Sequence, residues 1–387
     1  MKSAFWRTLA IVAIVAMPTL ANANDATIGS EAATSAMSGS TLNNTSALFN
    51  AWPHLVTMYG NGAEISTSNF STNRNAGMGK VWWEAYDELW LNLNVGRRDL
   101  GSQAANFLWG GPISNGFTLG GFGDQLEGFD AITNPWFNVG VAKPLAGGGA
   151  WSANVFLGSE SFEDETADPT YQNSATGYGA LLSWGNGEGL HLAGEFAMVT
   201  ETDEQNDPEL EGDVMSFSLN GRYDTDLYKY QGSFVYMTST TQNVVDGAAN
   251  DMDTDFLGFL ANAGRFLKNE VDGQTSAEFV FAYTTTDMND VTSSSIVLPG
   301  VRVSAWEKLS DTFGVMGGFQ SVYALNSTDD TSSSQGLDYA WTTGLFAQFT
   351  ENVRVDFELA PGGLDNVLSL GNEEELIAYL GATVGLN

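Results

Sequence analysis

The stretch DVMSFSLNGRYDTDLYKYQGSFVYMT (Asp213–Thr238) alternates between two kinds of side chain with a period of two. Alternating side chains point to opposite faces of a β-strand, and the polar residues Asp224–Leu227 indicate a turn between two such strands. We expect the apolar face of this hairpin to meet lipid and the polar face to meet a water-filled interior. The apolar set is Met215, Phe217, Leu219, Gly221, Tyr223, Tyr228, Tyr230, Gly232, Phe234 and Tyr236, and the polar set is Ser216, Ser218, Asn220, Arg222, Lys229, Gln231 and Ser233.

The same period-two alternation recurs through most of the 387 residues and predicts an all-β protein. The predicted architecture is a transmembrane antiparallel up-and-down β-barrel of about 16 strands, within a range of about 14–18. The predicted strands are residues 62–68, 77–86, 88–97, 134–142, 150–158, 175–185, 189–199, 213–223, 228–239, 254–264, 274–285, 295–306, 312–322, 337–348, 352–360 and 375–386.

Short and long links alternate between these strands, as expected for short periplasmic turns and long extracellular loops. The predicted long links carry most of the acidic residues, in runs such as Glu160–Asp168, Glu201–Asp213 and Asp246–Asp255. The longest link, 98–133, is rich in glycine and contains Trp109, Phe117 and Phe122. Two interpretations of it remain open, a constriction loop folded into the pore or over its mouth, and a surface loop.

The first 23 residues have the pattern of a secretory signal peptide. Lys2 and Arg7 precede an apolar run to Leu20, and Ala21-Asn22-Ala23 supplies a cleavage site. Later in the chain, no window is apolar for long enough to predict a transmembrane helix. An exported chain of alternating aromatic strands, without a predicted membrane helix, favours the outer membrane.

The chain is strongly acidic. After removal of the signal peptide, 12 basic and 47 acidic residues remain, a net charge of −35. Such a charge repels nucleic acid, so the expected partners are outer-membrane lipid and small solutes. Two interpretations of the acidic loops remain open, simple solvation and bridging to anionic lipid through divalent cations. No stretch specifies an oligomeric state.

Residues 24–60 differ from the predicted barrel of 61–387. Asn24–Ser46 is small and polar and predicts a flexible lead-in. Ala47–Gly60 is apolar and contains Pro53, which disfavours a central strand. This segment is either a short helix or turn at the inner mouth of the barrel, where it would act as a plug, or the first strand.

The polar face of the alternation also predicts which residues line the interior. About sixteen strands leave an aqueous channel unless a segment plugs it, whereas an ion-paired network would fill a closed barrel. The pore-lining candidates are Asn92, Asn94, Glu195, Arg222, Lys229, Glu278, Arg302, Arg354, Asp356 and Glu358.

Residues for covalent chemistry are scarce. The chain has no cysteine and two histidines, His54 and His191. We expect both histidines to be hydrogen-bonded residues of the lumen or its mouth. His191 lies near a predicted periplasmic turn, far from the outer rim where a barrel enzyme would work, which argues against a catalytic role. We therefore predict no catalytic residue, no metal site, no cofactor and no enzyme activity.

The signal peptide, the hairpins and the alternation of link lengths resemble the bacterial outer-membrane porin and transporter superfamily over about residues 62–387. The apolar N-terminal segment is also similar to the long-chain fatty-acid transporter group, in which the N-terminus forms a hatch. One departure is the end of the chain, Gly385-Leu386-Asn387, where such barrels usually end in an aromatic residue.

From these features we expect a porin-like channel for passive diffusion of small hydrophilic solutes. The alternatives are a hatch-gated transporter of hydrophobic compounds and a closed structural or adhesive barrel.

Overall fold

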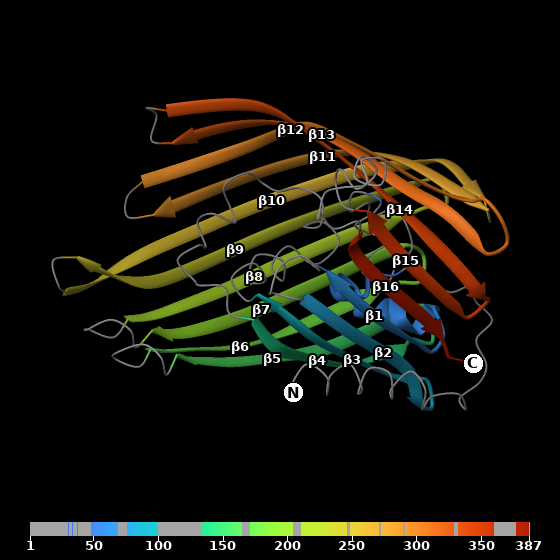
Figure 1. Cartoon of the computed structure of the whole chain (residues 1–387), viewed down its shortest axis with the longest axis horizontal. Helices are drawn as coiled ribbons and strands as arrows, with labels where there is room; N and C mark the ends of the chain where they lie inside the picture. The colour runs from blue at the N-terminus through green and yellow to red at the C-terminus, as the bar shows by residue number, and fades with distance from the viewer. Residues whose placement is uncertain are drawn as a thin grey trace, which may run out of the picture.

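The chain forms a closed barrel of sixteen antiparallel strands in sequence order (Figure 1). The computed structural model describes residues 30, 33, 37, 48–68, 76–99, 133–164, 171–203, 210–245, 248–270, 272–288, 291–328, 332–359 and 377–386. The predicted signal peptide (1–23) and the aromatic residues of the predicted constriction loop, Trp109, Phe117 and Phe122, lie outside these residues.

Each strand pairs with its neighbours in the sequence, and the first pairs with the last. The strands are β1 (Gly62–Ser68), β2 (Ala76–Tyr86), β3 (Leu89–Asp99), β4 (Thr133–Pro144), β5 (Ala150–Asp164), β6 (Tyr171–Gly185), β7 (Leu190–Asp203), β8 (Leu210–Asp224), β9 (Tyr228–Val245), β10 (Ala248–Glu270), β11 (Gly273–Met288), β12 (Val291–Lys308), β13 (Phe313–Thr328), β14 (Ser332–Thr350), β15 (Val353–Leu359) and β16 (Ile377–Gly385). The predicted number of strands is confirmed.

Several strands continue into stretches that the sequence pattern assigns to links. Residues 240–253 are a predicted long link, yet β9 runs to Val245 and β10 begins at Ala248. The predicted link 265–273 likewise belongs mostly to β10, which ends at Glu270. Backbone hydrogen bonds sustain an antiparallel ladder whatever side chains it carries. The apolar alternation therefore marks only part of a strand rather than its full length.

The two faces of the wall differ as the alternation predicts. On β8, Met215, Phe217 and Leu219 are exposed on the outer face, whereas the intervening Ser216 and Ser218 are buried. The turn after β8 is closed by the Thr225 N–H, which donates to the Tyr228 carbonyl over 2.8 Å. Barrel closure leaves no open sheet edge, because β1 pairs with β16 from Gly62 opposite Gly385 to Ser68 opposite Tyr379.

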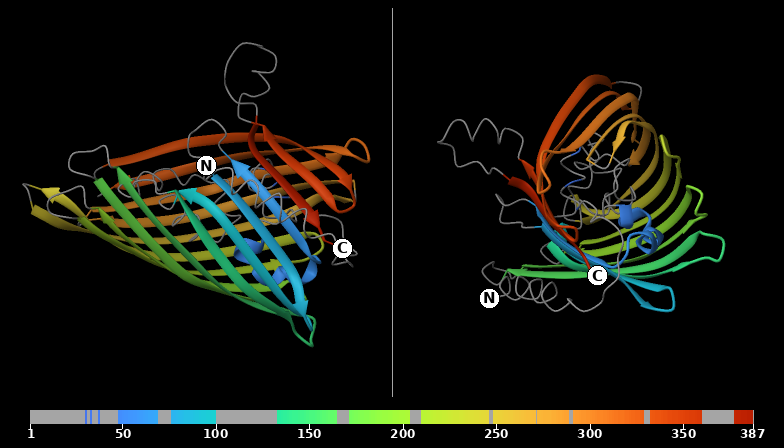
Figure 2. Two further views of the ribbon diagram at one scale, coloured as in Figure 1. Left: turned by 60° about the horizontal axis from the view of Figure 1, so that its bottom comes forward. Right: turned by 90° about the vertical axis from the view of Figure 1, so that its right-hand side faces the viewer.

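Residues 48–59 lie inside the barrel (Figure 2, right, blue). They contain the short helix α3 (Leu48–Ala51) and the 3-10 helix η1 (Pro53–Met58). Pro53 stands at the start of η1, where its missing N–H is not needed. Of the two predicted interpretations of 47–60, the short helix is therefore confirmed and the first strand is wrong. Among the described residues, none of the helices is long and apolar enough to span a membrane.

Candidate functional site

The predicted pore-lining residues lie on the inner wall, spread over seven strands. Eight of them are buried, and the side chains of Lys229 and Arg354 are each 12% exposed. They alternate with outward apolar residues and share their face with the residues that contact α3 and η1. The buried eight are Asn92, Asn94, Glu195, Arg222, Glu278, Arg302, Asp356 and Glu358.

Opposite charges on this wall pair with close neighbours. Glu64 and Lys80 are opposite each other on β1 and β2 with 3.9 Å between their charged atoms, and Glu278 and Arg302 are opposite on β11 and β12 at 3.6 Å. Arg354 and Asp356, two positions apart on β15, approach to 2.7 Å. These pairs therefore run along the wall rather than across the barrel. The Glu64–Lys80 pair was not among the predicted residues, although both lie on alternating strands.

Three asparagines from adjacent strands form a further group. The Asn154 amide donates to the side-chain oxygens of Asn92 and Asn138 over 2.8 Å and 2.9 Å. Asn154 lies against Gly140, where a β-carbon would come within 2.3 Å of its side chain. Only a residue without a side chain leaves room for this arrangement, so Gly140 positions the asparagine group.

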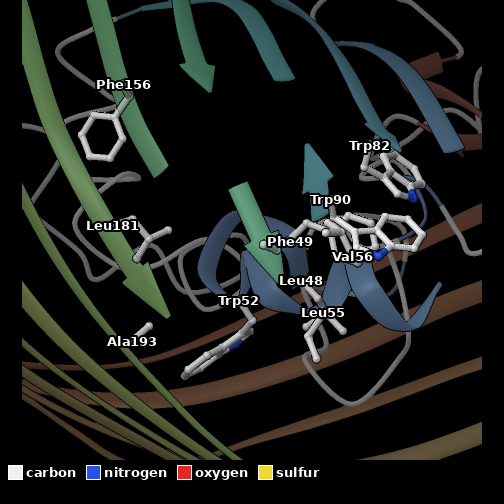
Figure 3. Close-up of a cluster of buried hydrophobic side chains, with 11 residues drawn as sticks. Leu48, Phe49, Trp52, Leu55, Val56, Trp82, Trp90, Phe156, Leu181 and Ala193 are labelled. Atoms are coloured by element: carbon white, nitrogen blue, oxygen red, sulfur yellow. The ribbon is translucent and has the colours of Figure 1, made fainter. Parts of the chain in front are cut away.

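An apolar cluster joins the N-terminal segment to the barrel wall (Figure 3). The ring of Phe49 meets Trp82 edge-on with 5.1 Å between ring centroids, and the Trp82 N–H donates to the Gly60 carbonyl over 2.8 Å. Burial of each large apolar side chain contributes about 1.5–3 kcal/mol. The segment contributes Leu48, Phe49, Trp52, Leu55 and Val56, and strands β2–β7 contribute Trp82, Trp90, Ala142, Phe156, Leu181 and Ala193. We call residues 48–59 the plug.

Upstream residues contact another part of the wall. Ala33 and Met37 pack against Met316 and Phe346, and the Ser30 backbone N–H donates to Asp356 Oδ2 over 2.9 Å. Met316 belongs to β13 and Phe346 to β14. The N-terminal part of the chain is thus attached to the wall on both sides of the β1–β16 seam.

A polar contact completes the attachment of the plug. His54 Nδ1 lies 2.7 Å from Ser183 Oγ on β6, and His54 Nε2 lies 2.9 Å from His191 Nδ1 on β7. His191 Nε2 is 4.0 Å from an oxygen of Asp224, which binds the Arg222 guanidinium at 2.8 Å. Burial, together with the charges of His191 and Arg222, lowers the pKa of His54 to about 3. His54 is therefore neutral in the docked plug near pH 7.

The two histidines are 137 positions apart in the sequence. The sequence predicts each as a hydrogen-bonded residue of the lumen or mouth but gives no signal that they meet. Ser183, which joins them, was not among the predicted residues; its place on the inner face of β6 follows from the alternation. Within the described residues, no three His, Cys, Asp or Glu side chains gather as a metal site requires.

Known proteins that resemble this chain are found among solved structures. No protein-family model and no curated protein matches it. It is similar to a "Bacterial polysaccharide outer membrane secretin" at 8% identity, over 85% of this chain and 99% of that chain, with a TM-score of 0.44. It is similar to CdiB from Escherichia coli at 10% identity, over 84% of this chain and 63% of that one, with a TM-score of 0.42.

A third similar structure is the outer-membrane expressed OmpT of Vibrio cholerae, at 11% identity over 84% of this chain and 94% of that chain, with a TM-score of 0.35. All three TM-scores lie below 0.5, so these likenesses do not indicate a function for this chain.

Proposed function

We propose that this protein is an outer-membrane channel for small hydrophilic solutes, closed at one end by the plug. The outer face supports membrane insertion: Leu157, Leu182 and Leu219 are 61%, 63% and 51% exposed, which lipid would cover. Sixteen paired strands are enough to enclose an aqueous passage. Transport of this kind needs no cofactor and no covalent chemistry.

The observation that carries this proposal is the polar inner wall. Ser, Asn and charged side chains occupy inward positions on most strands of the barrel, and three ion pairs, Glu64–Lys80, Glu278–Arg302 and Arg354–Asp356, lie along the wall. Such a wall offers hydrogen bonds to water and to polar solutes. Apolar residues share this face in places, some beneath the plug and others outside its cluster, such as Phe256, Leu260 and Val280 on β10 and β11.

Conductance in planar bilayers tests the proposal. We expect the full chain to show rare openings at neutral pH, and a variant lacking residues 48–59 to show frequent, larger steps. Trp52→Ala is the milder variant, because it empties one fully buried position of the same cluster while the rest of the plug remains. A folded deletion variant without channel steps would overturn the proposal and favour a closed structural barrel.

Transport of hydrophobic compounds is a second candidate, because the wall beneath the plug is aromatic. Trp82, Trp90 and Phe156 would face the lumen if the plug left. Solute uptake by liposomes that contain the deletion variant distinguishes the two functions. Preferential uptake of a small sugar supports the hydrophilic channel, whereas preferential uptake of an alkyl-chain compound supports the hydrophobic transporter.

A further inference from the structure

The plug meets the wall through buried polar contacts of His54, with His191 on β7 and Ser183 on β6. Their rings are stacked with 5.1 Å between centroids, and Trp52 of the plug lies 6.2 Å from the His191 ring. His54 is only 1% exposed. Its backbone N–H also donates to Ser183 Oγ over 3.3 Å. Both histidines of the chain therefore lie at the contact between the plug and the barrel wall.

The neighbours of this pair select one arrangement of its protons. A hydrogen on His191 Nε2 points toward the Asp224 carboxylate, which leaves Nδ1 free to accept from His54 Nε2. His54 Nδ1 then accepts from the Ser183 hydroxyl. In this arrangement each histidine is neutral, and every contact has one donor and one acceptor.

Protonation disturbs this contact. If both histidines were protonated, two N–H groups would stand face to face at a separation of 2.9 Å between nitrogens. A proton on His54 Nδ1 would place a cation in a buried position close to Arg222. Released from the wall, a histidine takes up the same proton in water without these costs.

The charges around the pair are mainly cationic. Arg222 and Asp224 come from β8 and pair with each other, and Lys229 of β9 lies 4.0 Å from Asp224. Glu278 of β11 interacts electrostatically with Lys229. Asp224, the carboxylate that approaches His191, is therefore already shared by an arginine and a lysine. The Ser183 hydroxyl on β6, which contacts His54, is joined to the Ser152 hydroxyl on β5 over 2.6 Å.

Gly185 shapes this joint. A β-carbon on it would lie 2.7 Å from His54 Nε2 and 2.8 Å from His191 Nδ1, closer than real side chains approach. A methyl group there would push the two rings apart without removing an ionisable group. Gly177, on the same strand and the same face, has 3.4 Å to its nearest neighbour and accepts a β-carbon in ordinary contact. The two glycines give a matched pair of variants.

We propose that the His54–His191 contact is an acid-sensitive latch, which holds the plug against β6 and β7 at neutral pH and releases it when the histidines are protonated. This inference rests on the proposed channel function. It gives that channel a regulating signal, the proton concentration on the side of the barrel where the plug lies.

The sign of the pH dependence follows from the two states of His54. An undocked histidine titrates near its ordinary pKa of about 6.5, whereas burial lowers the pKa of docked His54 to about 3. Docking is therefore strongest above pH 6.5 and weakens as pH falls from there toward 3. Lowering the pH from 7.5 to 5.5 shifts the equilibrium toward the undocked plug by about tenfold through this histidine alone. Most carboxylates stay ionised over that interval.

Channel recordings at pH 7.5 and pH 5.5 test the latch, with the ratio of the two open probabilities as the readout. We expect a ratio of about ten or more for the full chain, and a ratio near one for His54→Gln together with His191→Gln. Gly185→Ala should open more often at pH 7.5 than the full chain does, whereas Gly177→Ala should behave like the full chain.

The variant without residues 48–59 separates the two proposals. If it conducts at both pH values while the full chain stays closed at pH 5.5, the channel stands and the latch is overturned. An unchanged pH ratio in the double histidine variant would also overturn the latch. If the deletion variant does not conduct, the channel itself is overturned, and the latch with it.

Discussion

Asp356 shows how single inner-wall residues combine several contacts. It has no exposed surface, its Oδ1 accepts from Arg354 over 2.7 Å, and its Oδ2 accepts from the Ser30 backbone over 2.9 Å. The Arg354 guanidinium also lies over the Phe346 ring, 4.3 Å from its centroid. One carboxylate thus links the β15 wall to the N-terminal part of the chain.

Asp356→Asn should lower the free energy of unfolding by about 1.5–3 kcal/mol, the typical contribution of a hydrogen bond to a charged group. The amide oxygen can still accept from Ser30, but the charge that pairs with Arg354 is lost. Reversible urea unfolding in lipid vesicles measures the difference. Asp226→Asn, in an exposed turn, is the control and should stay within about 0.5 kcal/mol. Equal effects at both sites would contradict this account of Asp356.

Within each strand, successive side chains alternate between the outer face and the inner face of the barrel. Strand β8 turns Leu219 outward, while its neighbours Ser218 and Asn220 are buried on the inner face. Asn220 Oδ1 accepts from Ser233 on β9 over 2.6 Å, so the inner face is held by side-chain hydrogen bonds as well as the backbone ladder. A shift of one residue in register would exchange the two faces, which strongly favours the observed pairing.

Leu219→Arg should destabilise the folded barrel in lipid by about 2–4 kcal/mol, the cost of a lipid-facing arginine near the bilayer midplane. The same vesicle unfolding experiment measures it. Asp226→Arg adds the same side chain at the exposed turn beyond β8 and should change the stability by no more than about 0.5 kcal/mol. A Leu219→Arg variant as stable as the parent would argue that this face does not meet lipid.

At the scale of the whole molecule, closure by β16 completes the hydrogen bonding of the wall. Strand β16 pairs with β1 on one side and β15 on the other, and the Leu386 N–H donates to the Asn61 carbonyl over 2.9 Å just beyond it. Without β16, β1 and β15 would each expose a strand edge, and in a membrane no water reaches such an edge to satisfy its backbone groups.

Truncation after residue 376 should therefore prevent assembly of a folded barrel in lipid. The measurement is the shift in gel mobility between heated and unheated samples, which distinguishes a folded barrel from the unfolded chain. Removal of Asn387 alone keeps every residue of β16 and should leave the shift intact. A truncated chain that still migrates as a folded barrel would show that closure by β16 is dispensable.

The sequence was enough to determine the architecture because its signal is local. Alternation over Met215–Tyr223 reveals both faces of a strand, and its recurrence predicts the sixteen strands and the inward position of residues such as Arg302 and Glu358. The outer ends of the strands were underestimated, since β9 and β10 continue where the apolar alternation stops. A backbone ladder needs no particular side chain, so the apolar alternation does not mark where it ends.

Only the tertiary structure decided what occupies the interior and which inner residues meet. His54 contacts His191 across 137 positions, and Asp356 contacts Ser30 across 326. These contacts depend on the curvature and closure of the wall and on the path of the N-terminal segment within it. Period-two alternation specifies the face on which a side chain lies. It carries no information on distances around a closed barrel, because those follow from the combined register of all sixteen strands.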